Sequence, residues 1–308
     1  MKTSIAMLAV ALVCTGCQTT GIKIPDLGAN LTALAQAGSS HGAGAGQNDV
    51  VRLALQSGQK LKDATTEFTE EQEIVLGQGI ASNLLGAAPL LPNRNVQRYV
   101  NRVGRWLAVQ TERPDLPWQF AVLDDTGINA FAAPGGYIFI TSGMLARMNN
   151  EAELAGVLAH EIAHVLKKHH LQAIKKSAGM SLFADIGSHV VVAKTGVNSA
   201  LANNLAGAFK EVYTRGLDKE DEFEADRMGV VIAARAGYDP YGLPAVLQMM
   251  QAFSPQDSGF ALMFKTHPPL ADRLVLFEKL MTSSFERFEK QPTLAPRFMT
   301  SSGNVRKR

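Results

Sequence analysis

One short stretch constrains the fold of this chain more than any other. Residues 160–164 read His-Glu-Ile-Ala-His and lie inside an apolar run that ends at Leu166. Side chains four residues apart project from one face of a helix, so His160 and His164 can hold the same metal ion. Two histidines and a glutamate would be costly to bury in such a helix without a partner. The pattern therefore predicts a buried helix over residues 151–170 that supplies two ligands of a metal site.

The chemistry of these side chains narrows the choice of metal and reaction. Neutral imidazole favours zinc over a hard cation such as magnesium. Glu161 lies one position further round the helix, where its carboxylate can reach a water molecule instead of the metal. In that place it would accept a proton from the attacking water and later deliver it to a leaving amine. The residues predict a hydrolytic site with one zinc ion and Glu161 as its general base.

A catalytic zinc ion has three protein ligands and one open position, so a third ligand is needed. The best candidates lie on a helix predicted over residues 218–236. Glu222 and Asp226 are four residues apart, so one can bind the metal while the other orients a ligand histidine. Glu224 is a competing ligand, because spacing alone does not separate two glutamates on one turn. By itself such an acidic run would be interpreted as a solvated face; beside the histidine pair it predicts a ligand.

Other histidines are weaker candidates for the third ligand. His41 lies in a Gly-rich segment near the N-terminus, and His189 lies in an apolar stretch with no acidic neighbour within three residues. His169 and His170 follow the histidine pair and are interpreted as surface residues without a role. A carboxylate is therefore favoured as the third ligand.

The N-terminus is typical of an exported protein. A basic start and the short apolar run Ile5–Val13 predict a signal peptide over residues 1–16, and the run is too short to span a bilayer. The next residues are similar to a bacterial lipobox, which predicts a lipidated Cys17, although Cys14 stands where leucine is usual. An ordinary signal peptide is the alternative. Gln18, in place of aspartate, implies anchoring in the outer membrane, on its periplasmic face.

The rest of the chain is predicted to form one folded domain with flexible ends. Residues 17–50 are rich in small residues and predict a flexible, lipid-anchored tether, residues 51–287 the domain, and residues 288–308 a disordered tail. Apolar periodicity predicts an α+β fold that is mostly helical with a small β-sheet. The apolar stretch 178–208 is interpreted as packed helices and loops. Strands are expected at 118–123 and 136–140, and further helices at 96–109, 241–253 and 269–282, with another that begins at a capping box on Thr69.

These motifs resemble those of the zinc metallopeptidase family that includes the CAAX prenyl protease, the heat-shock protease HtpX and the outer-membrane assembly protease BepA. In that family the zinc is held by the two motif histidines and by the first residue of a Glu-x-x-x-Asp motif, which here runs from Glu222 to Asp226. The resemblance implies that Glu222 is the third ligand and that Asp226 supports the site. It also implies a zincin-like domain over most of the chain.

Two further segments carry the resemblance. Asn129–Ile140 resembles the segment that leads into the edge strand bordering the active-site cleft, to which an extended substrate would add as a further strand. His267-Pro268-Pro269 and Arg273 resemble the family's C-terminal His-Pro element, which implies that Arg273, as a fixed charge, and His267, as a hydrogen-bond donor, stabilise the oxyanion. In BepA-like members this histidine can instead occupy the open zinc position, so His267 is either a catalytic aid or a plug. The same residues also suit a simple turn before a helix.

The sequence as a whole predicts a zinc metalloendopeptidase of the bacterial envelope that cleaves unfolded or misassembled proteins, with Glu161, Asp226, His267 and Arg273 as catalytic residues. A chaperone or assembly factor for outer-membrane proteins, with little or no proteolysis, is the alternative, because it would use the same cleft. A structural zinc site closed by His267 is a third interpretation. The 30 basic and 28 acidic residues leave no basic field for a nucleic-acid partner.

Overall fold

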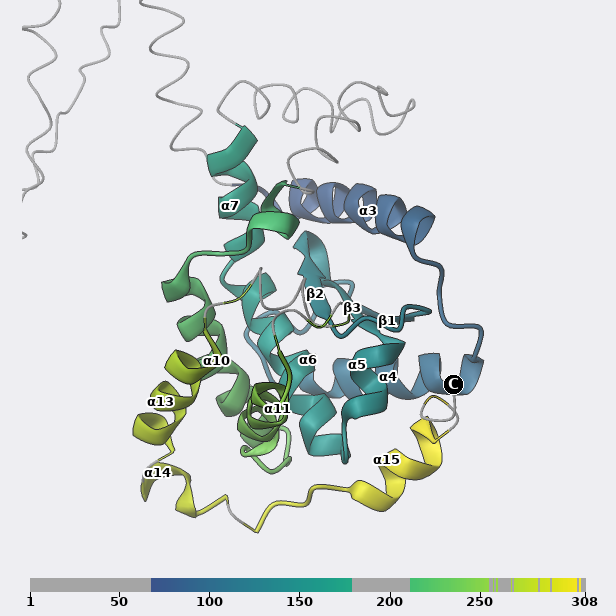
Figure 1. Ribbon diagram of the computed structural model, residues 1–308. Helices are drawn as coiled ribbons and strands as arrows, with labels where there is room; N and C mark the ends of the chain where they lie inside the picture. The colour runs from purple at the N-terminus through teal and green to yellow at the C-terminus, as the bar shows by residue number, and fades with distance from the viewer. Residues whose placement is uncertain are drawn as a thin grey trace, which may run out of the picture. The chain divides into compact units, whose positions relative to one another are not determined.

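Figure 1 shows the structure, a computed structural model. It describes residues 68–178, 211–254, 257, 259, 267, 269–281, 283–288, 290–303 and 305. All of these lie in one of the two units of the chain, Ser57–Arg308. The predicted signal peptide, the lipidated Cys17, the tether and nearly all of the apolar stretch 178–208 fall outside the described residues, as do His41 and His189. No helix in the described part of the chain is long and apolar enough to cross a membrane.

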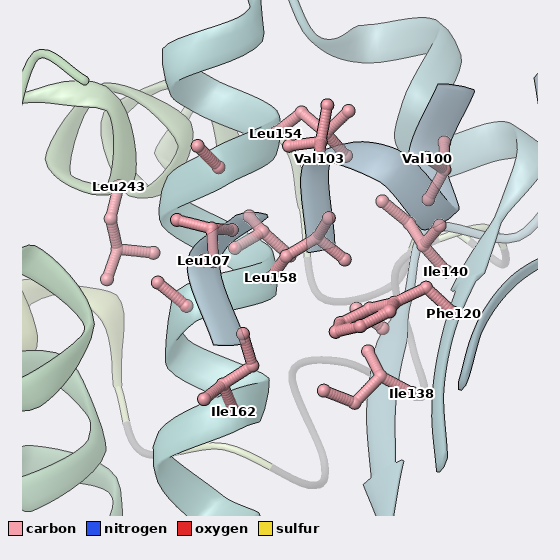
Figure 2. Close-up of a cluster of buried hydrophobic side chains, with 14 of the residues drawn as sticks. Val100, Val103, Leu107, Phe120, Ile138, Ile140, Leu154, Leu158, Ile162 and Leu243 are labelled. Carbon is pink, nitrogen blue, oxygen red and sulfur yellow. The ribbon is translucent and has the colours of Figure 1, made fainter. Parts of the chain in front are cut away.

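The helix of the histidine pair, α6 (Glu151–Leu166), forms the centre of the core, and every one of its residues is buried. Its side chains Leu154, Leu158 and Ile162 pack against α4 (Arg94–Ala108) and the sheet, as Figure 2 shows. A helix that is buried on every face lies inside the core rather than on the surface. The same burial places the histidine pair away from bulk water.

The sheet has three strands, in the order β1 (Gln119–Leu123), β3 (Tyr137–Thr141) and β2 (Ala130–Ala133). β1 runs parallel to β3 and β2 runs antiparallel to it, so β2 is an edge strand. The strands predicted at 118–123 and 136–140 are confirmed, and the fold is α+β as predicted. The segment Asn129–Ile140 was expected to lead into the edge strand. The structure shows instead that the segment contains the edge strand, β2, and ends in the central strand, β3. The strand β2 has no alternation of apolar and polar residues, because all four of its residues are buried. The sequence therefore gives no signal for it.

The helices predicted at 96–109, 218–236, 241–253 and 269–282, and the helix that begins at Thr69, are confirmed, with shifts of a few residues at their ends. α3 (Glu70–Ala87) begins at the capping box, where the Gln72 backbone N–H donates to the Thr69 hydroxyl and the Thr69 N–H donates to the Gln72 side chain. The others are α4, α10 (Lys219–Arg235), α11 (Gly242–Gln251) and α13 (Leu270–Leu280), with the short elements η1 (Pro134–Gly136), α5 (Ser142–Arg147) and α14 (Ser283–Glu286) between them.

The single helix predicted over residues 151–170 is wrong, because the structure has two helices there. α6 ends at Leu166, and α7 (His169–Ala178) begins after Lys168, whose φ of 58° lies in the left-handed region. An α-helix does not continue through a left-handed residue, so the chain turns at this point. Because the residues on both sides of the turn are helical, the apolar periodicity of the sequence does not reveal the break.

The disordered tail predicted over residues 288–308 is also wrong for the described part of that segment. Ala295–Ser302 form helix α15, which packs on α4 and α6 (Figure 1), and its Phe298 is fully buried. Arg297 of α15 donates hydrogen bonds to both carboxylate oxygens of Glu151, the first residue of α6. Phe298 and Arg297 alone make no periodic pattern, so the sequence does not predict this helix. Tertiary contacts stabilise it.

Candidate active site

Helices α6 and α10 lie side by side, and their crossing positions the candidate metal ligands. At Gly229 of α10 an added Cβ would lie 3.1 Å from the backbone nitrogen of His160, so only glycine allows the backbones to come this close without a shift. About two turns earlier on α10, Glu222 lies against the histidine pair. The close contact of the two helices thus brings acidic and imidazole side chains together.

Three side chains from these two helices converge on one point. The Nε2 atoms of His160 and His164 are 3.0 Å apart. One carboxylate oxygen of Glu222 lies 3.6 Å from His160 Nε2, and the other lies 3.6 Å from His164 Nε2. Zinc–ligand bonds of about 2.0–2.1 Å in tetrahedral geometry separate the ligand atoms by roughly 3.3–3.5 Å. The three predicted ligands, all buried, therefore have the spacing of a zinc site.

The electrostatics of these groups also fit a bound cation. The Oε2 atom of Glu222 is buried and has no hydrogen-bond partner among the described residues, and the Arg273 guanidinium lies 3.8 Å from it, so a metal ion would supply a direct partner. Burial raises the pKa of Glu222, but His267, His160 and His164 outweigh it and hold the pKa well below its usual value. Burial holds the pKa of His164 well below its usual value, so that imidazole is neutral, as a ligand must be.

His160 is supported from behind by a buried carboxylate. Its Nδ1 atom lies 3.1 Å from Asp226, which is fully buried. Burial lowers the pKa of His160, but Asp226 and Glu222 outweigh it and raise the pKa to about 9. These carboxylates therefore favour positive charge at His160, which a metal ion at Nε2 would supply in place of a proton.

Arg273 of α13 is held by Asp226. Its Nε and Nη2 atoms donate to the two Asp226 oxygens at 2.8 and 2.6 Å, while Nη1 lies 3.8 Å from Glu222. Burial raises the pKa of Asp226, but Arg273 outweighs it and holds the pKa well below its usual value. The resemblance implied an oxyanion role for Arg273. Two of its N–H groups thus bind Asp226, while the side chain also lines a cavity beside Glu161, and the oxyanion role stays a prediction.

Glu161 and His267 lie on the open side of the three ligands. One ligand atom of each, together with one of His160, lies within 4.8 Å of the others. Burial raises the pKa of Glu161 to about 7, a value suited to a proton acceptor near neutral pH. The Nε2 atom of His267 lies 3.8 Å from Glu222. This position is compatible with both roles that the resemblance implies for His267, the catalytic aid and the plug.

A cleft runs past Glu161 along the edge strand. Asn129 and Ala130, at the start of β2, line cavities on both sides of Glu161. One cavity continues past His164 and His170 to the segment around Tyr213. The other is lined by apolar side chains, Met144, Val157, Leu243, Val246, Leu247 and Met250. The predicted edge strand therefore borders the cleft.

The interpretation of His169 and His170 as surface residues is wrong. His169 is only 2% exposed, and its Nδ1 atom lies 2.9 Å from Nδ1 of His164. Its Nε2 atom lies 3.2 Å from Glu224, the glutamate that competed with Glu222 for the ligand role. His170 lines the cleft, and burial lowers its pKa to about 4. The prediction failed because no signal in the sequence indicates a left-handed residue at Lys168. The turn at Lys168 is what brings the two histidines beside His164.

Comparisons with known proteins show which family the chain is similar to. The profile of peptidase family M48 matches residues 94–280, more than half of the chain. The putative beta-barrel assembly-enhancing protease of Vibrio cholerae serotype O1 is 29% identical over 240 residues, which cover 75% of this chain and 47% of that protein. The beta-barrel assembly-enhancing protease of Escherichia coli strain K12 is 30% identical over 209 residues, covering 66% and 42%.

A eukaryotic protein is also similar to this chain. The mitochondrial metalloendopeptidase OMA1 of Schizosaccharomyces pombe is 30% identical over 187 residues, which cover 59% of this chain and 52% of that protein. The chain thus spans about half or less of the length of each of these relatives. The family match contains all of the converging side chains from His160 to Arg273. This chain belongs to peptidase family M48.

Proposed function

We propose that this protein is a zinc-dependent metalloendopeptidase that hydrolyses peptide bonds in unfolded or misassembled proteins of the bacterial envelope. The observation that carries the proposal is the convergence of His160 and His164 with Glu222, beside the buried carboxylate of Glu161. Membership of a peptidase family supports the reaction class. The bacterial relatives named as beta-barrel assembly-enhancing proteases support the envelope as the place of action.

The chain's own residues account for the steps of such a reaction. His160, His164 and Glu222 would hold the zinc ion, which supplies Lewis acidity that polarises a peptide carbonyl and activates water. The Glu161 carboxylate accepts a proton from the attacking water and passes it to the amide nitrogen of the leaving group. His267, which lies at the open side, donates a hydrogen bond to the carbonyl oxygen as negative charge develops there.

The cleft favours substrates that are locally unfolded. An extended chain could pair through backbone hydrogen bonds with the edge of β2 that has no strand partner among the described residues, and such bonds depend little on its sequence. Apolar side chains such as Val157 and Leu247 line the cavity beside Glu161, which favours an apolar substrate residue next to the bond that is cut. Folded proteins bury such segments, so exposure of one marks a misassembled protein. The lipobox-like residues before Cys17 support anchoring at the periplasmic face of the outer membrane.

Replacing Glu161 with glutamine tests the proposed reaction. The amide keeps the shape of the side chain but cannot accept the proton, so hydrolysis of unfolded casein should fall at least about 100-fold. Zinc content, measured by mass spectrometry of the metal, should stay equal to that of the wild type. A Glu161→Gln protein that cleaves casein at the wild-type rate would refute the proposal.

A chaperone or assembly role is the second candidate, because the same edge strand would hold a β-strand without cutting it. Complementation of a deletion strain separates the two. Wild type should restore resistance to large antibiotics that an intact envelope excludes, and Glu161→Gln should not. Restoration by both to the same level would favour binding over proteolysis.

A further inference from the structure

We propose that His169 and Glu224 form a relay that positions the metal ligand His164. The inference rests on the proposed function, because the relay matters only if His164 binds a metal ion. Three side chains make the relay, and they lie on α6, on α7 and on α10. Sequence spacing alone placed His169 on the surface and Glu224 in competition for the metal.

The contacts of the relay form one continuous chain. Nδ1 of His164 lies 2.9 Å from Nδ1 of His169, and both side chains are buried. Nε2 of His169 lies 3.2 Å from Glu224, and Lys167 holds the other oxygen of Glu224 at 2.7 Å. Asp221 lies 3.7 Å from the same nitrogen of His169, beyond hydrogen-bond distance.

The left-handed turn at Lys168 makes this contact possible. Residues five apart on a straight helix lie roughly 140° apart around its axis, so His169 would face away from His164. The turn ends α6 and returns the first residue of α7 to the back of the His164 ring. The left-handed backbone at Lys168 is therefore what allows the buried imidazole of His169 to contact His164.

A metal ion at Nε2 of His164 would fix the tautomers of both histidines in the relay. Nε2 of His164 faces His160 and Glu222, so it is the atom that binds the metal and carries no proton. Nδ1 of His164 then carries the proton and donates it to Nδ1 of His169. A neutral His169 that accepts at Nδ1 has its proton on Nε2, where it donates to Glu224. Each contact is satisfied in this arrangement alone.

The two ligand histidines are thus supported in different ways. Asp226 lies directly behind His160 and is itself held by Arg273. Glu224 acts on His164 through a second imidazole. Such partners fix the orientation of the ligand ring and raise its basicity, and their loss typically weakens metal binding 10–100-fold. We expect the loss of His169 to weaken zinc binding about 10-fold, because one imidazole separates the carboxylate from the ligand.

The first test is the zinc affinity of His169 variants, measured by competition with a chelator. His169→Phe fills the same space without either nitrogen and should bind zinc about 10-fold more weakly. His169→Asn places an oxygen near the position of Nδ1 and should recover part of the loss. Lys176→Ala, on the exposed side of α7, is the matched control and should bind as the wild type does. The visible spectrum of the cobalt-substituted protein should shift in His169→Phe and not in the control.

A second pair of variants keeps the test decisive if His169→Phe does not fold. Glu224 is about one-third exposed, so its replacement leaves the core intact. Glu224→Leu should weaken zinc binding, whereas Glu224→Gln keeps an acceptor and should bind more tightly than Glu224→Leu. If both His169→Phe and Glu224→Leu bind zinc with wild-type affinity, the relay is refuted, but the assignment of the three metal ligands is not. A wild type that binds no zinc would overturn the proposed function, and the relay with it.

Discussion

At the scale of single residues, two glutamates on one turn of α10 lie in opposite environments. Glu222 is almost fully buried and faces both ligand histidines. Glu224 is about one-third exposed and contacts His169 and Lys167. Positions two residues apart differ by roughly 200° around a helix, so only one of them can face α6. Which one does so depends on the rotation of α10 about its axis, and that rotation is set by packing.

This difference predicts the zinc content of two alanine variants. Glu222→Ala removes a ligand and should lose most of its zinc during dialysis against metal-free buffer. Glu224→Ala leaves all three ligands in place and should retain about one ion per chain, although with reduced affinity. Mass spectrometry of the metal measures both. Equal loss of zinc from the two variants would contradict the ligand assignment.

The pair formed by Asp226 and Arg273 predicts how stability depends on acid. The pKa of Asp226 is lower in the folded protein than in the unfolded chain. The unfolded state therefore binds the proton first, so the pair stabilises the fold above about pH 4 and loses this effect as the pH falls further. Asp226→Asn leaves a buried guanidinium without its charged partner, which should cost about 3 kcal/mol near neutral pH.

Urea unfolding of the metal-free proteins between about pH 7 and pH 3 measures this dependence. The free-energy difference between wild type and Asp226→Asn should shrink as the pH falls below about 4. Asp272→Asn changes an exposed pair with Lys219 and serves as the control, with an expected effect below about 1 kcal/mol. A difference for Asp226→Asn that stays constant across this range would contradict the expectation.

At the scale of elements, α6 is held at both ends by features with weak sequence signals. Its C-terminal end is defined by the turn at Lys168. At its N-terminal end, the fully buried Glu151 accepts hydrogen bonds from Tyr99, Tyr238 and Arg297. These partners come from α4, from the loop after α10 and from α15. The ends of the metal-binding helix are therefore fixed by residues that are distant in the sequence.

The contribution of α15 can be measured through Arg297. Arg297→Ala removes the cationic partner of Glu151, while the two tyrosine hydroxyls remain. Because the Arg297 side chain is about half exposed, the loss of stability should be about 2 kcal/mol rather than the larger cost of breaking a fully buried pair. Lys290→Ala, on an exposed position of the same segment, should change stability by less than about 0.5 kcal/mol. Thermal unfolding distinguishes them, and equal midpoints would contradict a role for α15.

At the scale of the whole molecule, the core does not depend on the metal site. Its largest fully buried side chains include residues of α4, β3 and α6 that Figure 2 labels, namely Leu107, Ile138, Ile140, Leu154, Leu158 and Ile162. The ligands occupy one end of this arrangement. Apolar burial on this scale supplies most of the stability of a domain.

Removal of zinc should therefore leave the protein folded. A chelator should abolish hydrolysis of casein and lower the unfolding temperature, because a ligand that binds only the folded state stabilises it. The near-ultraviolet circular dichroism should stay close to that of the zinc-loaded protein. Cooperative unfolding on chelation would instead support the structural zinc site closed by His267.

The sequence by itself determined what depends on neighbours along the chain. The spacing within residues 160–164, the capping box at Thr69 and the strands beside β2 follow from local geometry, and each agrees with the structure. Spacing made Glu222 and Asp226 candidates beside Glu224, and the resemblance to a known family assigned the ligand role to Glu222 and the supporting role to Asp226.

Three features are decided only by the tertiary structure: the glutamate that faces the histidines, the burial of His169, and the hydrogen bonds of Arg273 to Asp226. Each of these depends on the rotation of one helix against another, or on a turn at a single left-handed residue. Those features are set by packing between residues that are far apart in the sequence, so no local pattern encodes them.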